Sequence, residues 1–343
     1  MKTSIAVFVS ALAVLSLSPP VTAQKKKPVV KAAVAKVKKT PPKAGLNQGP
    51  AVQMPGDNGK VGVHYRLGGG EELVFTLEKA EFASRAILAD STLFANPGQR
   101  LLILSYAVQN PANADRFFFN QSFKFTVVSP DDKNLVCDTA GIHPDRLDRL
   151  SLQLKPAQKV RALAVIQIHP KGPVNKLIVQ RGEGTPVLRY DLRDKVKPFA
   201  GAFASDDGLD MLDVGRAKIS APFGLGPFDI NVEKVEESTT AVDGIDPESG
   251  KKLVMATVSV KNAGKQNQIM HGSILVARLL DENGEEMTFR TMAKMSSGDS
   301  FNQMIEPAQQ VRFRLVFESG LRAKPVSLTL KEQSSERSVG VSL

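Results

Sequence analysis

The sequence is poor in the residues that mark catalytic and disulfide-stapled proteins. Its 343 residues include no tryptophan, three tyrosines, four histidines and a single cysteine, Cys137. One cysteine cannot close an internal disulfide, and no histidine stands at the spacing of a catalytic triad or a zinc-binding motif. Nucleophile-elbow and phosphate-loop glycine motifs are absent as well. These absences favour a protein that is not an enzyme and that carries no cofactor.

Beyond its first residues the chain has no apolar run long enough to cross a bilayer. Lys2 precedes an apolar stretch from Ile5 to Leu17, which is too short to span a membrane well. Val21 and Ala23 supply the small residues of a cleavage site, so residues 1–23 are predicted to be a signal peptide, with an uncleaved anchor as the alternative. No cysteine follows the run, which excludes a lipoprotein anchor. We therefore expect a secreted or periplasmic protein with no transmembrane segment after signal cleavage.

Acidic residues are nearly missing from residues 24–60, a stretch rich in lysine, alanine and proline. Nine lysines there oppose one aspartate, so the stretch carries +8 of the formal net charge of +10. The rest of the chain is almost neutral, which argues against nucleic acid as a partner. The composition predicts a disordered leader that either spaces the domains from the envelope or binds an anionic envelope component. The lysines of this envelope-binding hypothesis are Lys25, Lys26, Lys27, Lys31, Lys36, Lys38, Lys39 and Lys43.

The remaining chain contains an internal repeat. Pro-Ala-Gln-Lys-Val-Arg at 156–161 returns as Pro-Ala-Gln-Gln-Val-Arg at 307–312, and each copy opens a run of alternating side chains. Other segments match in the same order, including two Glu-Lys pairs and two strands that end in asparagine, at Asn110 and Asn262. The matches predict a duplicated domain, with copies at 61–195 and 216–343 and a linker at 196–215.

Short alternating strands with turns between them, and almost no helical periodicity, predict an all-β fold of two tandem immunoglobulin-like β-sandwiches after the disordered basic leader. In the second repeated strand one set of side chains should face the core and the other should face water. The core set is Val311, Phe313, Leu315 and Phe317, and the solvent set is Arg312, Arg314 and Glu318.

Each half has a Glu-rich first strand, a Gly-led strand that ends in asparagine, a strand that runs into an acidic turn, and the proline-led strand. In these features the sequence resembles the immunoglobulin-like domains of unknown function, here in tandem copies, that occur in bacterial secreted proteins and lipoproteins. The resemblance implies a β-sandwich and transfers no catalytic residue. We expect a non-catalytic binding or scaffolding protein of the cell envelope.

The second half also contains soft metal ligands. Thioether and imidazole groups suit copper(I), so a copper-binding or chaperone module is the alternative function, and ordinary core methionine is the competing interpretation. The candidate ligands are Met270, His271, Met292 and Met295. An acidic turn at 281–286 offers the oxygens that calcium prefers, but its Asn-Gly step is typical of a hairpin.

Three consecutive phenylalanines, Phe117, Phe118 and Phe119, cannot all face one core, because neighbours in a strand alternate between its two faces. Either Phe118 alone or Phe117 with Phe119 is expected to face outward. The outward ring is covered by another part of the chain or forms a surface for an unknown protein partner.

Overall fold

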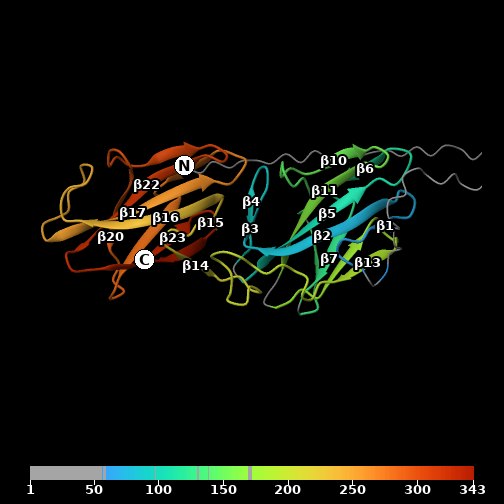
Figure 1. Ribbon diagram of the computed structural model, residues 1–343, viewed down its shortest axis with the longest axis horizontal. Helices are drawn as coiled ribbons and strands as arrows, with labels where there is room; N and C mark the ends of the chain where they lie inside the picture. The colour runs from blue at the N-terminus through green and yellow to red at the C-terminus, as the bar shows by residue number, and fades with distance from the viewer. Residues whose placement is uncertain (1–55, 57–58, 97, 130, 138, 169–171) are drawn as a thin grey trace, which may run out of the picture. The chain divides into compact units, whose positions relative to one another are not determined.

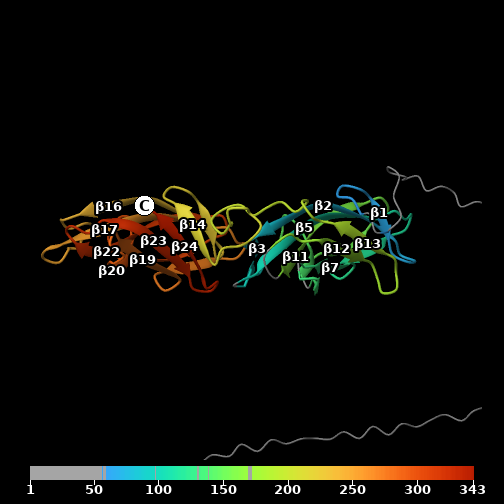
Figure 2. The same cartoon turned by 90° about the horizontal axis from the view of Figure 1, so that it is seen from below.

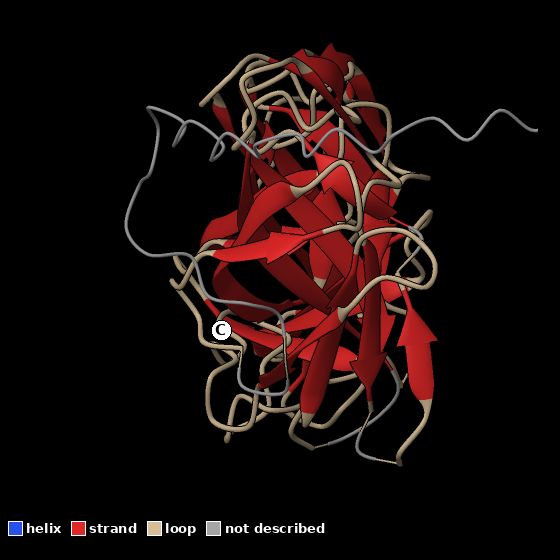
Figure 3. Cartoon of the chain, turned by 90° about the vertical axis from the view of Figure 1, so that its right-hand side faces the viewer, coloured by secondary structure: helices blue, strands red, loops and turns tan. Residues whose placement is uncertain are grey.

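The computed structural model describes residues 56, 59–96, 98–129, 131–137, 139–168 and 172–343. The predicted signal peptide, and the predicted leader apart from Gly56, Gly59 and Lys60, lie outside these residues. Every regular element of the described residues is a β-strand, as Figure 3 shows, and the all-β prediction is confirmed. Among the same residues no helix is long and apolar enough to cross a membrane.

The first sandwich pairs a five-stranded sheet with a four-stranded one (Figure 1). The larger sheet has the order β1 (Tyr65–Leu67), β2 (Leu73–Ala83), β5 (Arg100–Gln109), β11 (Lys159–Ile168) and β9 (Thr139–Ile142). The smaller has the order β13 (Val187–Asp191), β12 (Lys176–Gln180), β7 (Lys124–Val128) and β8 (Asn134–Val136). A two-stranded ribbon joins β6 (Arg116–Phe119) to β10 (Ser151–Leu154), and a hairpin joins β3 (Arg85–Ile87) to β4 (Thr92–Phe94).

The second sandwich has a similar plan. Its larger sheet has the order β15 (Phe223–Leu225), β16 (Phe228–Ser238), β17 (Lys251–Asn262), β22 (Gln310–Gly320) and β20 (Thr288–Lys294). Its smaller sheet has the order β14 (Val214–Lys218), β24 (Arg337–Ser342), β23 (Pro325–Glu332) and β19 (Leu275–Asp281). This smaller sheet gains the parallel edge strand β14 and has, in the part of the chain that the structure describes, no counterpart of β8. The ribbon is formed by β18 (Gln268–His271) and β21 (Asn302–Ile305).

Each sandwich closes around its own apolar core. In the first, Phe75 and Tyr106 of the larger sheet meet Phe125 of the smaller one, with ring centroids 6.0 and 5.0 Å away. In the second, the predicted core set of β22 is buried as expected. The predicted linker contributes Phe199 to the first core and Phe203 to the second. The exact domain limits stay predictions.

The repeated Pro-Ala-Gln stretch has the same local contacts in both sandwiches. The Asn110 Nδ2 group donates to Leu154 O at 2.8 Å, and the Asn262 Nδ2 group donates to Ile305 O at 2.9 Å. Both asparagines are fully buried. Each side chain therefore ties the end of a central strand to the residue two places before the repeated proline, which gives a physical reason for the repetition of both segments.

The repeated Glu-Lys and Val-Arg pairs also meet. Glu78 and Glu233 lie at β-bulges, where one extra residue turns the side chain. Arg161 Nε lies 3.1 Å from the Glu78 carboxylate, and Arg312 forms the same ion pair with Glu233. These arginines are exposed, so each pair contributes only about 0–1 kcal/mol to stability.

One side-chain assignment from the alternation is wrong. Glu318 was expected to face water with Arg312 and Arg314, but its side chain is 1% exposed. The reason lies in the loop between β16 and β17, because Val242 and Ile245 of this loop pack on a second, smaller apolar cluster of β17, β20 and β22. The outer face of the sheet is therefore covered at this end.

Candidate functional site

Three turns at one end of the first sandwich surround a pocket of about 390 Å³. They are the β1–β2 turn at 68–72, the β6–β7 turn at 120–123 and the β12–β13 turn at 181–186. Figures 1 and 2 both show β1 and β13 together at this end. We call this the arginine pocket. Its lining is Gly68, Gly69, Gly70, Glu71, Phe119, Gln121, Ser122, Arg181, Gly182 and Thr185.

Two of the turns are held by their own hydroxyl side chains. The Thr185 Oγ1 group donates to Arg181 O at 2.6 Å and lies 2.9 Å from Gly182 O, which closes the third turn. Ser122 Oγ accepts the Phe119 amide at 2.9 Å and closes the second turn. A pocket wall fixed in this way loses little conformational entropy when a ligand binds.

The side chain of Arg181 crosses from the third turn to the first. Its Nε donates to Glu71 O at 2.7 Å, and its guanidinium carbon lies 5.7 Å from the centroid of the Phe123 ring. Gly68 leaves room for this crossing, because a Cβ there would lie 3.1 Å from the Arg181 Cδ. The φ angle of +124° at Gly68 also favours glycine.

A second arginine, Arg116 of β6, lies beside the first. Its Nη1 is 3.6 Å from the Glu71 carboxylate. Both guanidinium groups are incompletely satisfied, because Arg181 Nη1 and Arg116 Nε are buried without a hydrogen-bond partner among the described residues. Burial lowers the pKa of Arg181; Glu71 opposes this effect and the positive charge of Arg116 adds to it. Arg116 is not a lining residue; it pairs with the largely exposed Glu71 carboxylate and so leaves the charge of Arg181 at the pocket wall.

The second sandwich carries the opposite charge at the corresponding position. Leu177 and Val179 of β12 are buried and precede Arg181, just as Leu328 and Leu330 of β23 are buried and precede Glu332. Glu332 is 2% exposed. Its carboxylate accepts the Ser334 amide at 3.0 Å, the Ser334 hydroxyl at 2.7 Å and the Ser335 amide at 2.7 Å. This turn is closed by its own carboxylate, whereas the arginine pocket is open.

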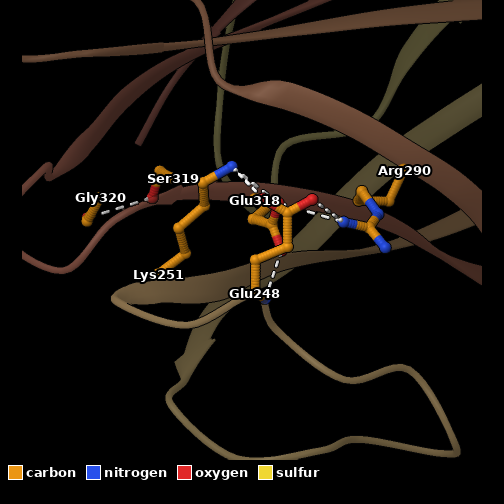
Figure 4. Close-up of polar contacts among 6 residues, drawn as sticks. All are labelled: Glu248, Lys251, Arg290, Glu318, Ser319 and Gly320. Carbon is orange, nitrogen blue, oxygen red and sulfur yellow. Dashed lines mark hydrogen bonds and ion pairs between the residues drawn. The ribbon is translucent and has the colours of Figure 1, made fainter.

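A second polar cluster surrounds the buried Glu318 (Figure 4). Its carboxylate accepts the Glu248 amide at 2.9 Å, Lys251 Nζ at 3.3 Å and Arg290 Nη1 at 3.1 Å. The Glu248 carboxylate lies 2.5 Å from Lys251 and 3.5 Å from Arg290. The Glu248 backbone hydrogen bond is the main reason that the pKa of Glu318 is lowered. Two carboxylates and two cations balance one another, so this cluster clamps strand ends together.

The predicted metal ligands are divided between core and surface. Met270 and Met292 belong to the second apolar core. His271 follows Met270 in β18 and so points to the other face, where its Nδ1 lies 2.8 Å from Ser273 Oγ; Met295 is half-buried just after β20. Within the described ranges no group of three His, Cys, Asp or Glu side chains could hold a metal ion. Copper binding stays a prediction.

The acidic turn has the contacts of a hairpin. Asp281 Oδ1 accepts the amides of Asn283 and Glu285, each at 2.9 Å. This carboxylate is therefore used by the turn's own backbone, as expected for an aspartate that starts a turn.

The phenylalanine run resolves into one inward and two outward rings. Phe118 is fully buried, whereas Phe117 is 53% exposed and Phe119 is half-buried. The outward rings lie side by side, with centroids 5.6 Å apart. The predicted envelope-binding lysines, Lys25 to Lys43, all lie outside the described residues.

The sequence interpretation did not identify Arg116 or Arg181. Comparison of β12 with β23 would have found Arg181, because extending the repeat by two residues sets it against Glu332. Arg116 gives no such signal, since its role depends on the convergence of three turns.

The comparisons with known proteins show a likeness to proteins of unassigned function. Residues 217–338 match the family described as Domain of unknown function (DUF4352). A solved uncharacterised β-sandwich protein from Clostridium difficile 630 is 16% identical, over 38% of this chain and 94% of that chain, with a TM-score of 0.29. A conserved hypothetical protein from Bacillus anthracis is 17% identical, over 33% of this chain and 87% of that chain, with a TM-score of 0.26. No curated protein matches. The family match supports the predicted resemblance of the second half to an immunoglobulin-like domain of unknown function.

Proposed function

We propose that this chain is an exported, non-catalytic binding protein of the cell envelope, built from two copies of one immunoglobulin-like domain. The first copy binds an anionic ligand in the arginine pocket, and the second copy is a closed scaffold. The shared strand order and the paired contacts of Asn110 and Asn262 support the duplication.

The contrast between Arg181 and Glu332 carries the proposal. A buried guanidinium nitrogen with no partner costs about 1–3 kcal/mol, so the fold does not gain from placing an arginine there. At the same position the second sandwich has a carboxylate with three hydrogen bonds, which stabilises its turn. Arg181 is thus explained by a ligand better than by folding, and its charge selects an anion.

Calorimetric titration of the purified exported protein with lactate, a small monocarboxylate, tests this function at physiological salt. Arg181→Gln should weaken binding about tenfold or more, the usual effect of losing a charged hydrogen bond. Arg161→Gln is the matched control, since it removes the same charge from an exposed side chain outside the pocket. Equal affinity in all three proteins would exclude the pocket as the anion site.

Export and envelope association form a separate part of the proposal, supported by the charged start, apolar run and lysine-rich stretch of the sequence. Cell fractionation and the intact mass of the recovered protein test it. A cytoplasmic product that keeps residues 1–23 would exclude export and leave the pocket argument intact.

A further inference from the structure

We propose that the ligand of the arginine pocket is an acidic sugar, a ring with one carboxylate such as a uronate unit of a polysaccharide. This inference rests on the proposed function and names its ligand class. Two features of the site point to it: an aromatic ledge beside the guanidinium groups, and a net charge that fits a single carboxylate.

The ledge consists of Phe117 and Phe119. Phe119 lines the pocket, and Phe117 extends the same outward face of β6 over a centroid distance of 5.6 Å. The apolar C–H face of a sugar ring packs on exposed aromatic rings, and its hydroxyl groups stay free for polar partners. The corresponding residues of β18 are Ile269 and His271, so the second sandwich has no such ledge.

The polar groups around the ledge match the rest of the sugar. Gln121, Ser122 and the exposed Glu71 carboxylate provide hydrogen-bonding groups within reach of ring hydroxyls. A pocket of about 390 Å³ is within the size range of small-molecule sites, about 300–1,000 Å³. It has room for a sugar unit, with the glycines at 68–70 leaving the entrance free of side chains.

The charge favours a carboxylate over a phosphate monoester. Arg181 supplies a positive charge at the pocket wall, and the Glu71 carboxylate is paired with Arg116, which lies outside the lining residues, so one carboxylate neutralises the site. A phosphate monoester carries about −1.5 to −2 at neutral pH and would leave excess negative charge beside Glu71. The planar guanidinium also matches the planar carboxylate.

The test uses trigalacturonate as the probe, with the exported protein at physiological salt. Its methyl ester and the neutral trimer maltotriose test the need for charge. Lactate tests the need for the ring, and a glycerol phosphate polymer tests phosphodiesters. The proteins are wild type, Arg181→Gln, Phe119→Ala and the control Arg161→Gln. Circular dichroism and urea unfolding verify that each variant is folded. The lysine-rich stretch is identical in all four, so its contribution cancels in the comparison.

Trigalacturonate should bind wild type and Arg161→Gln equally. Arg181→Gln should weaken it about tenfold or more, and Phe119→Ala should weaken it several-fold without changing the affinity for lactate. The ester and maltotriose should not bind. If Phe119→Ala has no effect, or if the glycerol phosphate polymer binds more tightly, the sugar assignment is wrong while anion binding at Arg181 stands. If Arg181→Gln binds every anion as wild type does, both proposals fail.

Discussion

Replacing Arg181 and Glu332 separately by methionine tests whether the two corresponding positions have different roles. Arg181→Met loses the 2.7 Å hydrogen bond to Glu71 O, which is solvent-accessible and so worth about 0.5–1.5 kcal/mol. The substitution also removes Arg181 Nη1, a buried nitrogen without a hydrogen-bond partner in the described part of the chain. In the wild type this nitrogen destabilises the folded state by about 1–3 kcal/mol, so its removal is stabilising. The two effects nearly cancel, so the free energy of unfolding should change by less than about 1 kcal/mol.

Glu332→Met has no such compensation. Three hydrogen bonds to the carboxylate are lost, although water can replace part of them because the serines of this turn are accessible. We expect a loss of about 2–4 kcal/mol. Urea unfolding followed by far-ultraviolet circular dichroism measures both midpoints and both slopes. If Arg181→Met costs as much as Glu332→Met, Arg181 is a structural residue and its burial gives no reason to expect a bound anion.

Three further predictions concern the scaffold. Glu318→Gln should lower stability by about 1–3 kcal/mol at neutral pH. The pKa of Glu318 in the folded protein is below its ordinary value of 4.5. The stability difference between wild type and Glu318→Gln should therefore be complete above pH 4.5 and shrink as the pH falls through the folded pKa. Urea unfolding at several pH values measures this difference. Asn262→Ala should cost about 2–4 kcal/mol by the same measurement, since it leaves buried groups without partners, and a loss under about 1 kcal/mol would contradict this role. Phe317→Ala should cost about 3–5 kcal/mol against under about 1 for Arg314→Ala, and equal losses would mean that the strand face is misassigned.

The fold was predictable because its main signals are local. Alternation along β22 separated the buried Phe313 and Phe317 from the accessible Arg312, since a strand places successive side chains on opposite faces. The repeated order of segments predicted that the two larger sheets would have the same strand order. The alternation did not predict that Glu318 is buried, because its burial depends on the loop at residues 239–250, which covers this part of the sheet.

The candidate site was less predictable, because its members are brought together by three separate turns. Gly68, Phe119 and Arg181 are more than 100 residues apart at the extremes and carry no motif. Gly68 leaves room for the Arg181 side chain, although the two residues lie far apart in the sequence. This role depends on which residues lie close together in the folded chain, and no periodic pattern in the sequence indicates it.

The internal resemblance of the two halves provides a control that single-domain proteins lack. A residue required by the fold should have a counterpart with the same contacts in both sandwiches, as Asn110 and Asn262 do. Arg181 and Glu332 occupy corresponding positions with opposite charges, so neither charge is demanded by the shared backbone. The Glu332 carboxylate accepts hydrogen bonds from the backbone of its own turn. The Arg181 guanidinium, at the wall of an open pocket, has a nitrogen without a hydrogen-bond partner among the residues that the structure describes. Under the proposed function, ligand binding accounts for the incompletely satisfied guanidinium of Arg181, because function can retain an arrangement that adds no stability.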